Sequence, residues 1–338
     1  MKKRELSIDI LRILATIIVL NYHFTALLGT ESSFIYKFSN GNWGACGVTV
    51  FFLISGFLLK KSACNTCGEI KSFYKKKFLR LFPMLYISFI IAYVIKSIII
   101  SNWLWGLAPW RFIFSAMGID MYLGFYNVPS YAIVGEWFTF AIIIVYLVFP
   151  LLNRLMEMHL KTTTFVIAAI YVIDLVFNFS GINRDYTLTN AVMIAWIGMI
   201  FFKYKKVIMT KCTMIMALAA GIIILFVNLP ITDRLPYAQA EGICIFLFLY
   251  IAIDQIMHRK KSPDKLLIFF SNMSYPTYIN HHFLLYLISN IILSIFGTWT
   301  FKLIILFYII WLAVTFCWSM GIYYLEKLLM KHIFARRN

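Results

Sequence analysis

The stretch Leu6–Gly29, LSIDILRILATIIVLNYHFTALLG, is apolar for long enough to cross a bilayer as one helix, yet it carries Asp9, Arg12 and His23. Ionisable side chains inside a membrane span are costly, and by default they mark a functional interior. Arg12 and His23 are eleven residues apart. Eleven helical steps of about 100° return almost to the starting direction, so the two side chains share one helix face. The pair predicts a functional membrane helix, although Arg12 could instead reach the lipid headgroups and His23 could be a packing residue.

The composition extends this interpretation to the whole chain. Of the 338 residues, 62% are hydrophobic and 18% are aromatic, and the mean hydropathy is +0.83. A water-soluble globular protein of this length needs more polar surface than such a composition provides. The sequence therefore predicts an all-α, polytopic integral membrane protein. We expect a single transmembrane domain over residues 1–338 without an appended soluble domain, so that any chemistry takes place inside the helical bundle.

Apolar windows of about 17–25 residues predict about ten transmembrane helices. They cover residues 8–29, 44–59, 83–100, 131–152, 163–179, 189–202, 212–229, 238–257, 275–296 and 301–325. Twenty-four of the 31 lysines and arginines then fall on one side of the membrane and four on the other. An excess of this kind marks the cytoplasmic side, so both termini are predicted to be cytoplasmic in a multi-pass plasma-membrane protein. The same asymmetry explains most of the net charge of +17 without nucleic acid as a partner.

Two loops carry further features. Cys64 and Cys67 form a close cysteine pair in a predicted cytoplasmic loop, where thiols stay reduced. A CxxC motif without a second pair is weak evidence for zinc, and we expect no metal. The longest predicted outer loop, Ser101–Ser130, is rich in tryptophan and tyrosine. Such residues usually mark the membrane interface, although their rings could also stack on sugar rings.

Three later segments place ionisable groups near the ends of predicted helices. In FYKKKFLRLFPMLY, Lys77 and Arg80 are three residues apart and hence neighbours on a helix. They could contact lipid phosphates or the phosphates of a soluble anionic cofactor. Glu136 lies about as deep below the outer end of its predicted span as His23 does in the first span. His281 and His282 are adjacent on a predicted helix, so at most one of them faces a given site.

In chain order these pieces resemble the membrane acyltransferase-3 family, bacterial integral-membrane enzymes that O-acylate exported glycans. The resemblance covers nearly the whole chain, but Lys77 stands where the family often has an arginine and Ile142 where many members have a glutamate. It rests on five motifs, namely Arg12-x10-His23, FFLISGFLL at 51–59, RLFPMLY at 80–86, WFTFAIIIVYLVFP at 137–150 and SYPTYINHH at 274–282.

The resemblance implies a reaction. An acyl group, usually acetyl, would move from cytoplasmic acyl-CoA to a hydroxyl of an extracytoplasmic cell-surface polysaccharide or glycan. Acetyl-CoA would be a co-substrate. His23 would act as the catalytic base, because an imidazole titrates near neutral pH. The cations Arg12, Lys77 and Arg80 would bind the CoA phosphates, and His281 would line the donor path.

A carboxylate partner for His23 is also expected. A carboxylate on the second ring nitrogen fixes the tautomer of a catalytic histidine and stabilises the imidazolium. Glu136 is the predicted partner, and Asp174 and Glu241 are the alternatives at a similar depth. The rival hypothesis is a flippase or transporter of a lipid-linked glycan. That function predicts inverted repeats with broken helices, and the sequence shows no such symmetry.

Overall fold

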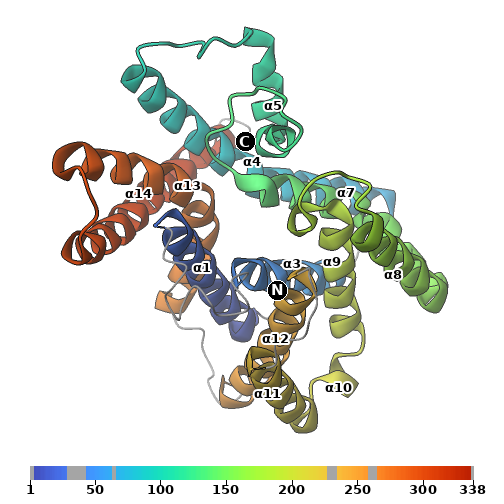
Figure 1. Ribbon diagram of the computed structural model, residues 1–338. Coiled ribbons are helices and arrows are strands. Elements are labelled where there is room, and N and C mark those ends of the chain that lie inside the picture. The colour runs from blue at the N-terminus through green and yellow to red at the C-terminus, as the bar shows by residue number, and fades with distance from the viewer. Residues whose placement is uncertain (1–3, 29–42, 63–65, 227–233, 258–264, 336–338) are drawn as a thin grey trace. The chain divides into compact units, whose positions relative to one another are not determined.

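The computed structural model describes residues 4–28, 43–62, 66–226, 234–257 and 265–335 (Figure 1). Within these ranges every regular element is a helix, which confirms the all-α prediction. Eight of the described helices are long and apolar enough to cross a membrane. They are α1 (Leu6–Leu27), α3 (Trp43–Lys61), α4 (Cys67–Ile99), α7 (Glu136–Met158), α8 (Leu160–Phe177), α12 (Leu235–Met257), α13 (Lys265–Phe296) and α14 (Phe301–Ala335).

Two shorter apolar helices occupy the remaining predicted positions. They are α9 (Leu188–Lys203) and α11 (Lys211–Phe226), and each has 16 residues. A helix of that length rises about 24 Å, somewhat less than the ~30 Å thickness of the hydrocarbon layer. The membrane character of the chain therefore rests on eight helices, while the count of ten and the cytoplasmic position of both termini stay predictions.

Two helices begin well before their predicted starts. The span expected from residue 83 is the second half of α4, which begins at Cys67, and the span expected from residue 275 belongs to α13, which begins at Lys265. The predicted windows began at Pro83 and one residue before Pro276, and proline is common in the first turn of a helix. In the structure Pro83 and Pro276 lie inside continuous helices. An internal proline removes one backbone hydrogen bond and bends a helix without necessarily ending it.

The chain forms two compact units, and each consists of two separate segments. The first unit comprises Met1–Phe73 and Ala141–Asn272, and the second comprises Tyr74–Phe140 and Met273–Asn338. Helices α4, α7 and α13 each run from one unit into the other without a break. Neither unit is therefore a contiguous stretch of sequence.

Helix α3 is the most buried of the candidate membrane helices and lies at the centre of the first unit, in contact with α1, α9 and α12. Glycines allow this close packing. A Cβ atom on Gly56 would collide with the backbone carbonyl of Ala195 in α9, and a Cβ atom on Gly198 would collide with that of Leu53. Small residues let helix backbones approach each other closely in membranes. The motif FFLISGFLL is thus a helix-contact surface.

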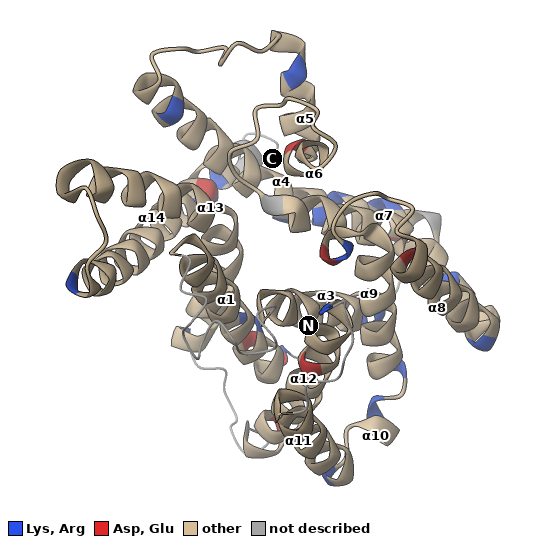
Figure 2. Ribbon diagram, in the orientation of Figure 1, with Lys and Arg blue, Asp and Glu red and all other residues tan. Residues whose placement is uncertain are grey.

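Figure 2 marks the charged residues on the ribbon, and several of them in the first unit form ion pairs at helix ends. Lys61 Nζ lies 2.6 Å from Glu5 Oε1, and the Tyr250 hydroxyl donates to Glu5 Oε2 at 2.7 Å. Burial raises the pKa of the Glu5 carboxyl, but these hydrogen bonds and the charge of Lys205 more than offset it and hold the pKa below its ordinary value. The N-terminal segment is thereby fixed to α3 and α12 by satisfied charges.

In the second unit, Asn280 of α13 links three helices. Its side chain is fully buried, donates to Ser88 Oγ of α4 at 2.9 Å and accepts from Trp318 Nε1 of α14 at 3.2 Å. The connection between α4 and α7 folds into three short helices, η2 (Pro109–Arg111), α5 (Phe112–Met117) and α6 (Asp120–Gly124). The Phe112 and Tyr131 rings stack with centroids 3.9 Å apart. This long loop is thus ordered by its aromatic residues.

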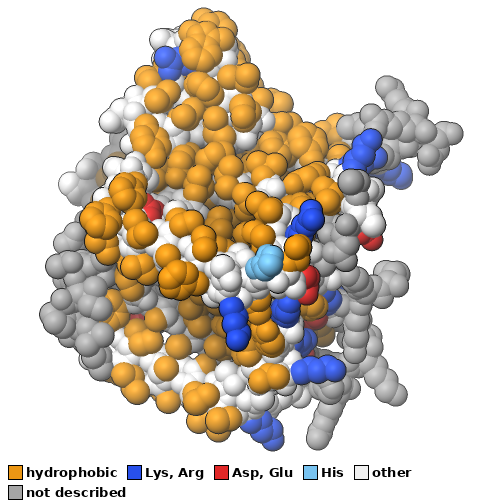
Figure 3. All heavy atoms as spheres, turned by 90° about the vertical axis from the view of Figure 1, so that its right-hand side faces the viewer, with side chains coloured by type: hydrophobic (Ala, Val, Ile, Leu, Met, Phe, Trp, Pro, Cys, Tyr) orange, Lys and Arg blue, Asp and Glu red, His pale blue; other side chains and the backbone are white. Residues whose placement is uncertain are grey.

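Large apolar side chains remain exposed on several helices. On α8 they include Phe165, at 74% exposure, and Phe177, at 68%, and in the space-filling view hydrophobic side chains dominate the visible face (Figure 3). Exposed apolar surface of this extent is not stable in water. It fits a lipid environment and supports the membrane assignment.

Candidate active site

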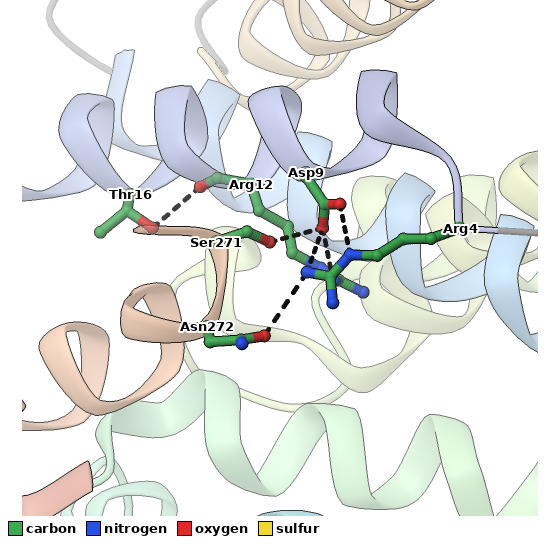
Figure 4. Close-up of polar contacts among 6 residues, drawn as sticks. All are labelled: Arg4, Asp9, Arg12, Thr16, Ser271 and Asn272. Atoms are coloured by element: carbon green, nitrogen blue, oxygen red, sulfur yellow. Dashed lines mark hydrogen bonds and ion pairs between the residues drawn. The ribbon is translucent and has the colours of Figure 1, made fainter. Parts of the chain in front are cut away.

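Asp9, in the first turn of α1, is the centre of a polar cluster (Figure 4). Its side chain is almost fully buried. Arg4 donates from Nε to Oδ2 at 2.6 Å and from Nη2 to Oδ1 at 2.9 Å. Arg12 Nη1 lies 3.6 Å from Oδ1, and Ser271 Oγ of α13 donates to the same oxygen at 2.7 Å. Asn272 Oδ1 lies 3.5 Å from Arg4 Nη2 and completes the cluster.

The cluster carries a net positive charge, because two guanidinium groups share one carboxylate. The Arg4 side chain is 38% exposed and that of Arg12 is 18% exposed, so both remain accessible to a ligand. Guanidinium groups bind phosphate oxygens through paired hydrogen bonds. Asp9 therefore orients the arginines without cancelling their charge. Sequence reasoning missed Arg4, because it lies outside the apolar stretch and looks like an ordinary cytoplasmic charge.

His23 lies on the same unbroken helix as Arg12 and is half-buried near its C-terminal end. The Tyr22 ring meets the imidazole edge-on, with centroids 5.2 Å apart, and also meets the Trp43 ring of α3 at 5.8 Å. A Cβ atom on Gly44 would collide with the Tyr22 ring. This packing holds the end of α1 that carries His23 against the beginning of α3. The assignment of His23 as a base stays a prediction.

Two of the candidate carboxylates are buried in the first unit. Asp174 of α8 is 7% exposed and accepts a hydrogen bond from the Thr189 hydroxyl of α9. Glu241 of α12 is 3% exposed. Asp174 thus has a structural partner of its own.

The third carboxylate, Glu136, begins α7 in the second unit, and its side chain lies outside the described atoms. The preceding residue connects this helix to α13, because Gly135 N donates to Ile279 O at 3.3 Å. The Phe138 and Tyr278 rings pack at 5.1 Å between the same helices. The second unit therefore brings the start of α7 next to the segment that carries His281.

His281 is fully buried, and its hydrogen bonds set the orientation of its ring. Nδ1 lies 2.6 Å from the backbone carbonyl of Tyr278, and the His281 carbonyl accepts from Trp311 Nε1 at 3.2 Å. A carbonyl oxygen only accepts, so Nδ1 carries a proton and the neutral ring has its lone pair on Nε2. The sequence pairs Tyr278 with His281 but gives no indication of Trp311. His282 is half-buried beside it.

The predicted basic pair lies on α4, where Lys77 and Arg80 are three residues apart on a helix, as expected. Lys77 is half-buried and Arg80 is exposed. Their role in binding phosphate stays a prediction. Of the cysteine pair, Cys64 and the side chain of Cys67 lie outside the described part of the chain.

Comparisons with known proteins give two matches. A family model described as an acyltransferase domain matches residues 5–324. A protein of Shigella phage Sf6 described as an O-acetyl transferase is 33% identical over 94 residues, which are 28% of this chain and 27% of the phage protein. The chain thus aligns with about a quarter of the length of that relative. No solved structure matches the chain.

Proposed function

The chain belongs to the acyltransferase family whose model spans residues 5–324, and on this basis we propose that it is an integral-membrane O-acyltransferase. It transfers an acetyl group from cytoplasmic acetyl-CoA to a hydroxyl of an extracytoplasmic cell-surface polysaccharide or glycan. The description of the phage relative as an O-acetyl transferase supports acetyl as the group and oxygen as the acceptor. The eight long apolar helices support a location in the membrane, for which we propose the plasma membrane.

The polar cluster around Asp9 is the observation that carries the donor side of this proposal. An acyl-CoA donor brings several phosphate groups, and its site needs partly exposed cations held in place. Arg4 and Arg12 meet this requirement, since both contact the buried carboxylate of Asp9 and both remain partly exposed. Lys77 and Arg80 add positive charge in the second unit, and His281 lines the donor path.

The reaction needs one base and one leaving group. His23 removes the proton from the acceptor hydroxyl while the hydroxyl oxygen attacks the thioester carbonyl carbon. The carbon–sulfur bond then breaks, and the CoA thiolate leaves and takes the proton from the imidazolium. Glu136 orients the imidazole and stabilises its charged form. The products are the O-acetylated glycan and free CoA, and no metal is needed for this balance.

The test is mass spectrometry of the surface glycans of cells that do and do not express the chain. Expression should add the mass of one acetyl group to the glycan repeat, and His23→Ala should abolish this gain because the base is lost. His332→Ala, a change at an exposed histidine near the end of α14, is the matched control and should keep it. Protein abundance is measured in each membrane fraction. A normal gain in the His23→Ala strain would contradict the role of His23, and no gain with the unaltered chain would contradict the function.

A further inference from the structure

The second unit contains a small pocket in the connection between α4 and α7. It is lined by residues from α4, from the end of α5, from α6 and from the segment before α7, and it has room for about one water molecule or one hydroxyl group. The lining residues are Leu85, Phe89, Ser115, Gly118, Asp120, Met121, Val134 and Gly135. Gly118 and Met121 are half-exposed, so the pocket lies close to the surface of the unit.

Two polar side chains in this pocket each have one oxygen atom whose hydrogen bonding is incomplete. Asp120 is 6% exposed and Ser115 is 7% exposed. Among the described residues, Asp120 Oδ1 and Ser115 Oγ make no hydrogen bond of normal geometry. Leaving a buried polar atom without a hydrogen bond costs about 1–3 kcal/mol. Native proteins therefore contain few such atoms, and each one calls for an explanation. A polar group in the pocket, from a water molecule or from a ligand, would complete their hydrogen bonding.

The chemistry of the lining restricts what that group can be. None of the described lining residues is basic, so the pocket does not attract an anion. One carboxylate and one hydroxyl are too few ligands for a divalent cation. Burial raises the pKa of the Asp120 carboxyl, and the nearby hydroxyls of Ser115 and Ser130 offset this only in part. A carboxyl group exchanges hydrogen bonds with a neutral hydroxyl in either protonation state.

One aromatic ring, that of Phe89, lines the pocket, and further aromatic residues adjoin lining residues in the sequence. Phe114 directly precedes Ser115, and its ring lies 5.5 Å from that of Trp110, which is 62% exposed. Tyr122 directly follows Met121 and packs against Phe125 at 5.8 Å. A polar group that fixes a ligand together with surrounding aromatic surface is a common arrangement in binding sites for small molecules. Sugars offer both a hydroxyl for the first and an apolar ring face for the second.

The walls of the pocket are also connected to the segment that carries His281 in the same unit. Gly135 lines the pocket with a positive φ of 92°, and a Cβ atom there would lie 2.8 Å from Leu85 Cδ1. The amide of the same glycine donates to Ile279 O, two residues before His281. The pocket and the His281 segment are therefore built on one backbone contact within the second unit.

From these observations we propose that the Asp120–Ser115 pocket is an acceptor subsite, in which Asp120 holds one hydroxyl group of the sugar that is to be acylated. The inference rests on the proposed function for the identity of the sugar as an acceptor. Asp120 is a binding residue here and takes no proton in the transfer. The pocket has room for one hydroxyl group only, so the rest of the sugar ring lies outside it.

The test compares the full-length wild type, Asp120→Asn and Ser115→Ala in lipid nanodiscs. The probes are methyl glycosides of glucose, galactose, rhamnose and N-acetylglucosamine, together with the monodeoxy analogues of whichever glycoside binds. Saturation-transfer NMR measures sugar binding, and acetyl transfer from acetyl-CoA gives KM for each substrate. Asp185→Asn, at an aspartate in the first unit, is the matched control.

The expected result is specific to one sugar hydroxyl. Asp120→Asn should raise KM for the glycoside about tenfold or more, as for one lost charged hydrogen bond, and leave KM for acetyl-CoA unchanged. One deoxy analogue should bind the wild type poorly but bind Asp120→Asn as well as the parent sugar does. Ser115→Ala should also raise KM for the glycoside. The control Asp185→Asn should have the same KM values as the wild type.

Two results would overturn the subsite. One is an unchanged glycoside KM and deoxy pattern in Asp120→Asn, and the other is an absence of saturation transfer to any methyl glycoside in the wild type. The NMR measurement does not depend on turnover. Sugar binding without acetyl transfer would therefore contradict the proposed reaction and leave the subsite supported.

Discussion

At Asp120 the protein keeps a carboxyl group in an environment that does not favour its charge. Burial raises the pKa of this group above its ordinary value. The folded protein then holds the proton more tightly than the unfolded chain, so stability is lost as pH rises from the unfolded pKa through the folded one. The ionised carboxyl thus lowers the free energy of unfolding at neutral pH. A residue that lowers stability in this way is often required for function.

This cost gives a prediction about stability. Asp120→Asn replaces the ionisable carboxyl by a neutral amide. The Tm of the variant at pH 7 should therefore exceed that of the wild type by about 2 °C. The difference in Tm should decrease toward pH 4, where the wild-type carboxyl is protonated. Thermal unfolding in nanodiscs at both pH values measures this. A lower Tm for the variant at pH 7 would show that the carboxylate stabilises the fold.

The two adjacent histidines of α13 give a second prediction at the same scale. The hydrogen bond to Tyr278 O places the lone pair of His281 on Nε2, toward the donor path that we assign to this residue. Asparagine keeps an N–H donor near the position of Nδ1 but offers nothing at Nε2. His281→Asn should therefore lower acetyl transfer about 100-fold or more, while His282→Asn should change it less than about threefold.

Initial rates with acetyl-CoA, normalised to folded protein, check this comparison. Size-exclusion profiles of both variants serve as the control for folding. A larger loss in His282→Asn would assign the wrong histidine to the donor path.

The predicted site residues differ in how far the sequence could place them. Arg12 and His23 stand out because charge inside an apolar run is costly, and their spacing alone puts them on one helix face. The other partners of Asp9 could not be found in this way. Arg4 is near in sequence but Ser271 is 262 residues away from Asp9, and only the folded chain brings it close.

At the scale of the helix, the close contact of α3 with α9 depends on two glycines. The backbone carbonyl of Ala195 occupies the space that a Cβ atom on Gly56 would need. Gly56→Ala should therefore force the helices apart, reduce the folded yield and lower Tm by several degrees. Gly321→Ala in α14 is the matched control, since no atom lies within 4 Å of its added Cβ. Fluorescence-detected size-exclusion chromatography after heating measures both, and equal melting of the two variants would contradict the contact.

Helix positions were predictable from apolar windows, but helix starts were not. A hydropathy window detects the part of a helix that crosses lipid. It does not detect a polar extension of that helix, such as the residues of α4 before Pro83. At Pro276 the sequence leaves two structures open, because the first turn of a helix and a kinked interior both tolerate proline. Only the backbone distinguishes the two.

For the whole molecule, the distribution of charge predicts the topology. The great excess of lysine and arginine on one side predicts that both termini are cytoplasmic. An even number of spans, such as the predicted ten, would be consistent with that prediction. Green fluorescent protein fused to the C-terminus should fluoresce, and alkaline phosphatase at the same position should be inactive. Phosphatase inserted after Gly106, in an open part of the long loop, should be active. An active C-terminal phosphatase fusion would reverse the orientation.

The division into two interleaved units was not predictable, because every apolar window looks alike in hydropathy. Which helices pack together depends on particular side chains, such as the glycines of α3 and α9 or the Asn280 contacts with α4 and α14. A single transmembrane domain remains our expectation for the whole chain.

The interleaving of the units has a consequence for how the protein is made. Residues up to Phe73 belong to a unit whose other segment ends only at Asn272, so early helices enter the membrane long before their packing partners leave the ribosome. Helix α3 is synthesised before α9 and α12, so its glycine-lined surface stays uncovered until those two helices have been made. During that interval the nascent chain depends on lipid, or on the insertion machinery, to cover surfaces that the finished protein buries.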